Sequence, residues 1–282
     1  MKLVKTIYLL VVVATLTSCE KFVTDVDVPV VKQQLVLFSF VSPEDTAIKA
    51  EVWMSKPVFS RNNNKTEEPV KDVTVTIISP TGQSALLLFN ESVQAYYIHQ
   101  SEFKIEAGKT YKITAVKGDF SLSATTTVPT HAAEVSGYTY QNLGGQNTSG
   151  NLPNYRHHIK WVDLADAKNY YRLSLSKLYV NNNDTGYNHI DDVMVNDESR
   201  NQQQLSALFD DYTHTFEFDS TNKKVMAFLL TTDEAYYQYH LRRLNYYGED
   251  PFSEPYPQYN NVNGGLGVFA SYRKTQKSYS FK

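Results

Sequence analysis

The chain has 282 residues with 27 basic and 30 acidic side chains, so it is slightly acidic at neutral pH. This balance argues against a nucleic-acid-binding protein, which needs a basic surface, and the single cysteine excludes an internal disulfide. The 21 tyrosines and 14 phenylalanines favour β structure, in which aromatic side chains pack well. The length suits two domains.

The first predicted element is a signal peptide over residues 1–18. Lys2 and Lys5 give a positive start, an apolar run follows from residue 7 to residue 16, and small residues precede Cys19. This order is typical of a secretory signal. The apolar run has about half of the roughly 20 residues that a bilayer-spanning helix needs, which argues against a permanent transmembrane helix. Without residues 1–18, 25 basic and 30 acidic side chains remain, a net charge of −5.

The four residues "LTSC" at the end of this segment resemble a relaxed lipobox, the signal of bacterial lipoproteins. In such proteins a diacylglycerol is attached to the cysteine sulfur, the chain is cleaved before the cysteine, and the new amino terminus is acylated, for example with palmitate. The resemblance implies Cys19 as the site of lipid attachment. More than one acyl chain gives stable membrane anchoring. An ordinary secreted protein with a chance cysteine is the alternative.

After Cys19 we expect an acidic tether over residues 19–32, followed by a β-sandwich domain over residues 33–129. The sandwich is predicted to be a seven-stranded Greek key of the immunoglobulin or fibronectin type III kind, because short alternating strands and turn signals follow one another closely. In "AIKAEVWM", for instance, Ile48, Ala50, Val52 and Met54 share one face. The strands are expected at 34–41, 47–54, 72–79, 84–90, 95–100, 109–118 and 120–129.

A second β-rich domain is expected over residues 133–282. It contains one convincing helix near 232–247, where Thr231 and Glu234 have the spacing of a capping box and the acids Asp233 and Glu234 favour the positive end of the helix dipole. The strands of this domain are expected at 134–141, 156–163, 170–180, 214–219, 223–232, 265–272 and 277–281.

Clusters of tyrosine form the main candidate for a binding surface. Tyrosine combines a large apolar area with a polar tip and is enriched where proteins bind partners. Packing of the same tyrosines in the core of the second domain is an equally open reading. The residues of the candidate binding surface are Tyr236, Tyr239, Arg243, Tyr247, Tyr256 and Tyr259.

We predict no catalytic residues, no metal site and no cofactor. His157 and His158 are adjacent on an expected strand, so their side chains point to opposite faces. The glycines of "NGGLG" lack the spacing of a phosphate-binding loop and indicate a turn with positive φ at Asn263, Gly264 or Gly265. Acid pairs such as Asp191-Asp192, Asp210-Asp211 and Asp163 with Asp166 are expected in solvated loops.

The most distinctive part of the sequence is "EDPFSEPYPQYNNVNGGLGVFASY" near the C-terminus. With the lipobox and the segments "VKDVTVTI", "GKTYKITA" and "ATTTVP", it resembles a Bacteroidota outer-membrane lipoprotein family catalogued as a domain of unknown function. The resemblance covers nearly the whole mature chain and implies an envelope protein often encoded beside TonB-dependent receptors. It supplies no reaction. The sharpest matching positions are Pro251, Phe252, Glu254, Pro255, Asn261, Gly264, Gly265, Gly267 and Phe269.

These observations predict a lipid-anchored accessory or binding protein of the outer membrane, the partner of a TonB-dependent transporter in ligand capture or uptake. The ligand is a small molecule, a glycan or a peptide. A surface hydrolase acting on glycans or peptides is one alternative, and a structural module that only binds other envelope proteins is another. Acidic residues close behind Cys19 favour the cell-surface side of the outer membrane over the periplasmic side.

Overall fold

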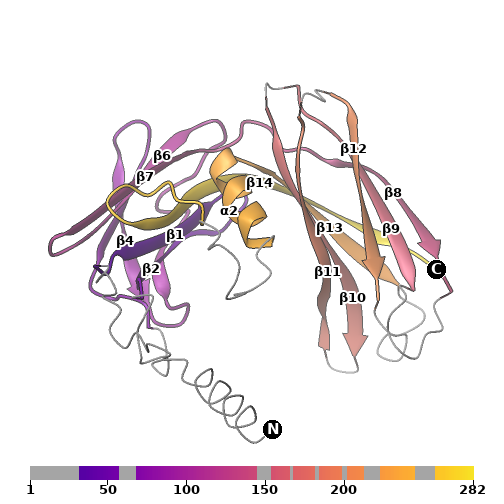
Figure 1. Ribbon diagram of the computed structural model, residues 1–282, viewed down its shortest axis with the longest axis horizontal. Helices are drawn as coiled ribbons and strands as arrows, with labels where there is room; N and C mark the ends of the chain where they lie inside the picture. The colour runs from indigo at the N-terminus through magenta and orange to yellow at the C-terminus, as the bar shows by residue number, and fades with distance from the viewer. Residues whose placement is uncertain are drawn as a thin grey trace, which may run out of the picture. The chain divides into compact units, whose positions relative to one another are not determined.

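The computed structural model describes residues 32–56, 68–144, 154–165, 168–181, 184–198, 202–212, 223–244 and 258–282. Within these ranges the chain consists of β-strands and one helix, which confirms the prediction of a mainly β protein (Figure 1). The predicted signal peptide, Cys19, the tether up to residue 31 and the expected strand at 214–219 lie outside the described residues. All elements named below belong to one compact unit, Gln33–Ser55 with Lys65–Lys282.

The strands form a large sheet and a small one. The large sheet has eleven strands in the order β11-β10-β13-β14-β1-β2-β5-β4-β3-β6-β7, and the small sheet has three in the order β12-β9-β8. The elements are β1 (Leu35–Val41), β2 (Ala47–Met54), β3 (Thr74–Ile78), β4 (Ser84–Asn90), β5 (Ala95–His99), β6 (Thr110–Lys117), β7 (Phe120–Thr127), β8 (Val135–Asn142), β9 (Tyr155–Val162), β10 (Tyr170–Asn181), β11 (Asp184–Asn196), β12 (Gln204–Asp211), β13 (Lys224–Thr232), α2 (Glu234–Leu244) and β14 (Leu266–Ser280).

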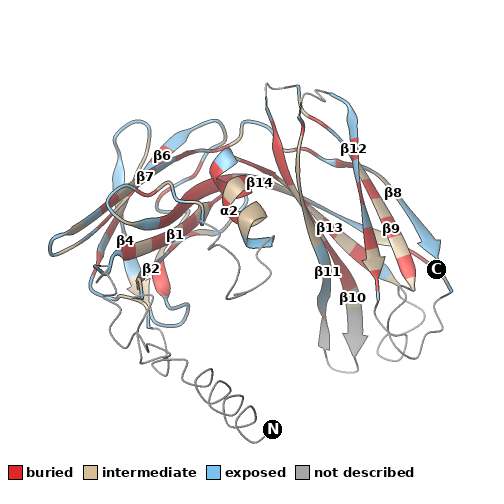
Figure 2. Ribbon diagram, in the orientation of Figure 1, coloured by how far each residue is buried: buried red, intermediate tan, exposed pale blue. Residues whose placement is uncertain are grey.

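Strands β1 to β7 lie where the sequence predicts the seven strands of residues 33–129. Strands β1, β2 and β5 are neighbours, and the β4–β5 hairpin joins them to β4, β3, β6 and β7. Because successive side chains of a strand point to opposite faces, every second residue is buried in β1 and β2 (Figure 2). These inward residues form one core cluster. It includes Leu35, Leu37, Ile48, Val52, Val75, Ile77, Tyr111 and Ile113.

The last strand, β14, connects the two expected domains. Its first part pairs in parallel with β1, from Val36 opposite Leu266 to Val41 opposite Ser271. Its second part, from Tyr272 onward, pairs antiparallel with β13. The expected regions 33–129 and 133–282 therefore share one sheet, and the two strands expected at 265–272 and 277–281 form one strand of 15 residues.

The glycines of "NGGLG" allow β14 to lie close to its neighbours. Gly264 has a φ of 82° and Gly267 a φ of 119°, which confirms the predicted turn and the role of glycine at positive φ. A Cβ atom on Gly267 would collide with the carbonyl oxygen of Leu37, and one on Gly264 with that of Ser121. These family-like positions therefore serve the fold by bringing β14 against β1 and β7.

Two further positions of the family-like motif, Asn261 and Phe269, are paired with each other. The Asn261 side-chain amide donates to the Phe269 carbonyl at 2.8 Å, and its Oδ1 accepts from the Phe269 N–H at 3.0 Å. The Asn261 side chain thus pairs both the N–H and the C=O group of a buried strand residue. Buried backbone groups without a hydrogen-bond partner would destabilise the fold. Pro251, Phe252, Glu254 and Pro255 lie outside the described residues.

Residues 133–282 also contribute a second core, between the small sheet and the β10–β13–β14 part of the large one. Ile159, Trp161 and Phe209 from the small sheet meet Tyr171 and Leu229 from the large sheet in one buried cluster. The indole of Trp161 contacts the ring of Tyr171 edge to face, with centroids 5.9 Å apart. Such aromatic contacts add to the stabilisation from burial itself.

Helix α2 begins one residue after its cap, and the cap differs from the predicted one. Asp233 caps the helix, because its Oδ1 accepts from the Tyr236 N–H at 2.8 Å. Thr231 instead belongs to β13, and its hydroxyl oxygen accepts from the Ala133 N–H at 2.9 Å. The predicted capping box of Thr231 and Glu234 is therefore wrong, since the strand ladder continues through Thr232.

Candidate ligand-binding groove

The candidate site starts from the outer face of β1. Val36, Phe38 and Phe40 occupy this face, at positions that alternate with the buried core residues of the same strand, and all three are half-buried. Strand β1 lies between β2 and β14. A central strand that is apolar on both faces needs cover on both. Helix α2 supplies part of this cover, and the rest of the face forms the floor of a groove.

Helix α2 packs its aromatic side chains on the two phenylalanines of β1. The rings of Phe38 and Tyr239 have centroids 5.7 Å apart, and those of Phe40 and Tyr236 are 5.5 Å apart. The His240 ring lies 5.2 Å from Phe40. Aromatic pairs at these separations attract each other beyond the effect of buried area. The contacts therefore hold the two phenylalanine rings in place.

A groove of about 780 Å³ lies beside this aromatic contact, over the outer face of β1 and β2. Ligand sites commonly have volumes of roughly 300–1,000 Å³ and combine apolar walls with a few polar groups. This groove meets both conditions. It is lined by Val36, Phe38, Phe40, Asp45, Thr46, Ala47, Lys49, Glu51, Trp53, Met54, Ser55, Tyr239, Arg243 and Tyr272.

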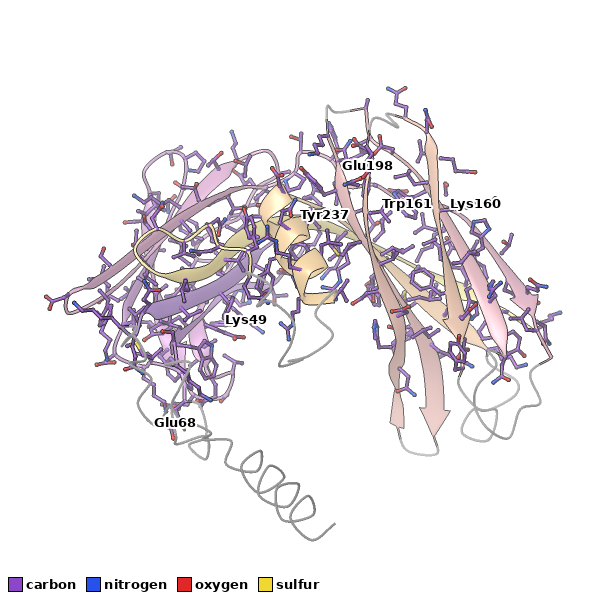
Figure 3. The ribbon with its side chains drawn as sticks, in the orientation of Figure 1. Lys49, Glu68, Lys160, Trp161, Glu198 and Tyr237 are labelled. Carbon is purple, nitrogen blue, oxygen red and sulfur yellow. The ribbon has the colours of Figure 1, made fainter. Side chains whose placement is uncertain are left out.

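Charged side chains of both signs surround the apolar floor. Lys49 and Glu51 point outward from β2, where the alternating residues Ile48 and Ala50 point into the core, and Lys49 projects away from the ribbon (Figure 3). Arg243 is exposed on the last turn of α2. Within the described part of the chain, Lys49 and Arg243 have no ion-pair partner.

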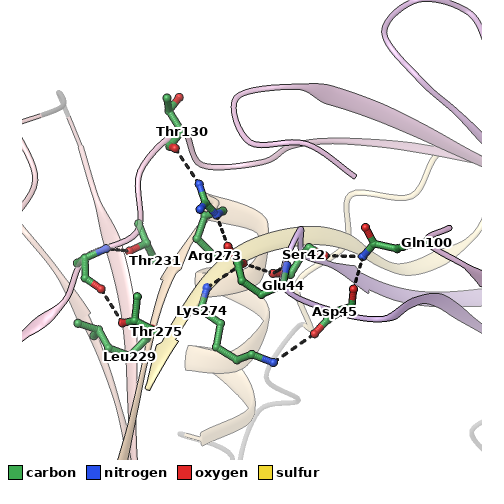
Figure 4. A network of polar contacts seen from close by, with 11 residues as sticks. Ser42, Glu44, Asp45, Gln100, Thr130, Leu229, Thr231, Arg273, Lys274 and Thr275 are labelled. Carbon is green, nitrogen blue, oxygen red and sulfur yellow. Dashed lines mark hydrogen bonds and ion pairs between the residues drawn. The ribbon is translucent and has the colours of Figure 1, made fainter. Parts of the chain in front are cut away.

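The wall at the far end of the groove is fixed by hydrogen bonds between the β1–β2 turn and β14 (Figure 4). The Tyr272 hydroxyl donates to the Asp45 carboxylate at 2.7 Å, and the Lys274 ammonium lies 3.3 Å from the same group. The Arg273 guanidinium donates to Glu44 at 2.7 Å. Gln100 holds the turn from the other side through the carbonyl oxygen of Asp45, at 2.9 Å.

These contacts shift the pKa values of the groups involved. Burial, together with the neighbouring carboxylate of Asp45, raises the pKa of Tyr272, so this phenol stays protonated and remains a donor. Burial alone would raise the pKa of Glu44, but its hydrogen bonds from Ser42 and Arg273 outweigh burial and lower it. At neutral pH the Tyr272 phenol in the wall is therefore protonated and donates to Asp45. The Glu44 carboxyl beside the wall is ionised and accepts from Arg273.

A second pocket of about 420 Å³ lies next to the groove and shares Phe40 and Tyr272 with it. Arg172 lines this pocket, forms an ion pair with Asp192 and donates to the Tyr236 hydroxyl at 2.9 Å. Burial, with the nearby positive charge of Arg172, lowers the pKa of His240 to about 3. The imidazole that packs on Phe40 is therefore uncharged at neutral pH.

Residues 20–278 match the model of a family described as Domain of unknown function (DUF4249). The chain belongs to this family. No curated protein matches the chain. The family match spans strands β1 to β13, helix α2, the glycine-containing C-terminal segment and β14 as far as residue 278. In this DUF4249 member that segment positions β14, the strand whose neighbour β1 carries the groove floor.

The six residues predicted as a binding surface have different positions in this DUF4249 member. Tyr239 and Arg243 line the groove. Tyr236 is buried, packs on Phe40 and lines the second pocket, where its hydroxyl accepts from Arg172. Tyr259 lies apart from the groove lining, with its ring 5.8 Å from the Arg242 guanidinium. Tyr247 and Tyr256 lie outside the described residues.

The acids considered for a hydrolase are held by partners where the structure describes them. Asp210 forms an ion pair with Arg156, and the buried Asp211 forms one with Lys177 at 2.8 Å. Asp192 pairs with Arg172. Asp163 is buried rather than solvated, and it accepts from the Tyr171 hydroxyl at 2.7 Å. The expectation of solvated loops is therefore wrong. Asp191 and Asp192 belong to strand β11, and Asp210 and Asp211 belong to strand β12, although Asp191 is exposed. Asp163 and Asp211 are buried because they complete hydrogen bonds of the second core.

His157 and His158 point to opposite faces of β9, as predicted: His157 is fully buried and His158 is half-buried. Among the described residues there is no cluster of three or more histidine, cysteine or acidic side chains that could hold a metal ion. In the same ranges, no helix combines the length and the apolar character needed to cross a bilayer.

Proposed function

We propose that this protein is a lipid-anchored binding protein of the outer membrane, which captures a ligand in the groove over β1 and β2 and passes it to a TonB-dependent transporter. The observation that supports it best is the groove itself: an aromatic floor on the solvent side of a sheet, next to two cations that have no ion-pair partner among the residues that the structure describes. Helix α2 covers Phe38 and Phe40 only in part. Val36 and Trp53 extend the apolar surface along the groove, where polar residues are the rule for the solvent face of antiparallel strands.

The groove is suited to binding because its walls are fixed before a ligand arrives. The phenylalanine rings are held by α2, and the end wall is held by the bonds of Glu44 and Asp45 to β14. A preformed site avoids the free-energy cost of ordering side chains during association. The exposed charges of Lys49 and Arg243 at its rim are able to orient a ligand.

The anchor in this proposal is an acylated Cys19, 14 residues before Gln33, where the compact unit begins. A connection of this length spans at most about 45–50 Å when extended. Capture at the cell surface, close to a transporter in the same membrane, fits such a reach. The acidic residues of the tether favour that side.

Fractionation of cells tests the anchor. We expect Cys19→Ala to release the protein from the membrane fraction, because the thiol that receives the lipid is lost. Ser18→Ala is the matched control, since it keeps the cysteine and a small residue before it, and we expect it to remain in membranes. Membrane retention of Cys19→Ala equal to that of the wild type would contradict lipid anchoring.

Affinity capture tests the partner. The tagged, lipidated protein is purified from membranes in mild detergent, and the co-purified proteins are identified by mass spectrometry. We expect a TonB-dependent receptor in the wild-type sample and its depletion from the Cys19→Ala sample. Repeated recovery of no transporter, with the protein itself recovered intact, would rule out a stable complex and with it the proposed transport role.

A further inference from the structure

The floor of the groove has a regular repeat. Val36, Phe38 and Phe40 follow one another at every second position of β1, and Lys49, Glu51 and Trp53 do the same on β2. Two residues of a strand advance by about 6.6–6.8 Å. Any other chain in an extended conformation presents side chains on one face at this same interval. The floor therefore matches the geometry of an extended peptide laid along β1 and β2.

The groove also has the length that a peptide needs. Its lining includes β2 residues from Ala47 to Met54 and continues to Ser55, and eight steps along a strand cover about 26 Å. A ligand of a few rings would fill only part of this distance. An extended peptide of about eight residues would contact the whole length of the floor.

The charges at the rim select among peptides. Glu51 lies near the Trp53 indole N–H, at 3.4 Å, so this acid faces a neighbour within the floor. Lys49 and Arg243 have no acidic partner among the residues that the structure describes. Two unpaired cations beside an apolar floor are complementary to carboxylates that flank apolar side chains.

From this geometry we infer that the groove binds an extended peptide whose alternate apolar side chains enter the floor and whose carboxylates lie against Lys49 and Arg243. The inference rests on the proposed function and specifies its ligand. Recognition takes place through side chains, because β1 already pairs with β2 on one edge and β14 on the other. Addition of a strand at the edge of β1, a common mode of peptide binding, is therefore not open to the ligand.

Fluorescence anisotropy with the full-length, detergent-solubilised lipoprotein tests this inference. The probe is a fluorescein-labelled eight-residue peptide in which leucine alternates with threonine and glutamate. The control peptide has the same composition with the four leucines in one block. We expect the alternating peptide to bind at least tenfold more tightly. Equal affinity of the two peptides, or binding of neither, would overturn the inference.

Two variants connect the binding to the groove. Lys49→Glu reverses an exposed charge at the rim, and we expect it to lower the affinity for the alternating peptide at least fivefold. Lys112→Glu makes the same change at an exposed position of β6 outside the groove, and we expect unchanged affinity. An equal loss of peptide affinity in the two variants would overturn the inference. The peptide would then be attracted by the net charge of the protein and not by the groove. Since both lysines are exposed, neither change threatens folding.

Maltoheptaose, an uncharged oligosaccharide of similar length, serves as the competing ligand. We expect no displacement of the labelled peptide. If maltoheptaose binds and the alternating peptide does not, the peptide inference fails while capture of a ligand in the groove remains supported. Failure of the proposed function itself is seen separately, as the absence of a transporter in the affinity capture.

Discussion

The apolar side chains on the two faces of β1 differ in burial and in what they contact. Leu35 and Leu37 on the inner face are fully buried among the residues of the first core. Phe38 and Phe40 on the outer face are half-buried, and they meet α2 on one side and the groove on the other. Residues one position apart therefore pack in the core on the inner face and line the groove on the outer face, where we propose that a ligand binds.

The largest expected effect comes from truncation of the inner face. Leu37→Ala removes a side chain with 0% exposure, and such truncations cost about 2–5 kcal/mol. Val36→Ala, the neighbour on the outer face, is expected to cost about 1 kcal/mol or less, as for partly exposed sites. Urea unfolding of the two variants measures both values. Similar losses of stability at the two positions would contradict the division between the faces.

A smaller effect is expected at Asp233, the cap of the helix that covers the outer face. Burial, partly offset by hydrogen bonds from Thr126 and from the helix, raises the pKa of Asp233 to about 6, from 3.8. The protonated form is thus favoured in the folded state, so this stabilisation is present below pH 4 and is lost as the pH rises through about 6. Because Asp233 keeps some contact with solvent, we expect a change of about 1–2 kcal/mol.

The variant Asp233→Asn provides the measurement. Asparagine keeps an acceptor for the Tyr236 N–H but does not titrate. Thermal unfolding is measured for both proteins at pH 4, 6 and 8. We expect the stability of Asp233→Asn, relative to that of the wild type, to rise from pH 4 to 6 and again from pH 6 to 8. The same difference in stability between variant and wild type at all three pH values would show that burial does not raise the pKa of Asp233.

The smallest effect is expected at Arg273, which holds the β1–β2 turn next to the end wall of the groove. Arg273→Lys loses the planar guanidinium that donates to Glu44 and to the Thr130 carbonyl, and loss of such bonds costs about 1 kcal/mol. Arg156→Lys is the control, since its pair with Asp210 is more exposed and exposed pairs contribute about 0–1 kcal/mol. Peptide affinity should fall only for Arg273→Lys. Equal affinity in both variants would show that the wall does not organise the groove.

The parts of the fold that follow from local patterns could be predicted. Alternation in "AIKAEVWM" gave β2 with its limits and its buried face, and the glycines of "NGGLG" gave the turn before β14. Strands β11 and β12 were not predicted. Strand β11 is an edge strand with several asparagines and aspartates, and its pairing with β10 along its whole length overrides these weak propensities.

The groove could be predicted only in part. Tyr239 and Arg243 were found through the tyrosine cluster of the helix, but Phe38, Phe40 and Trp53 were not. The available signal was "LVLFSFV", which is apolar at nearly every position and so indicates a strand covered on both faces. The element that covers the outer face could not be predicted from this signal. It depends on the pairing of β14 with β1 and on the position of α2 after β13, and these contacts join residues some 200 positions apart.

Photo-crosslinking in living cells tests most directly whether the outer face of β1 and β2 is the binding site. Lys49→benzoylphenylalanine places a photoreactive group at the rim of the groove, and Lys112→benzoylphenylalanine places the same group on β6, away from it. We expect covalent adducts with a peptide or with the transporter at position 49 and none at position 112. Adducts at position 112 with none at position 49 would contradict this expectation.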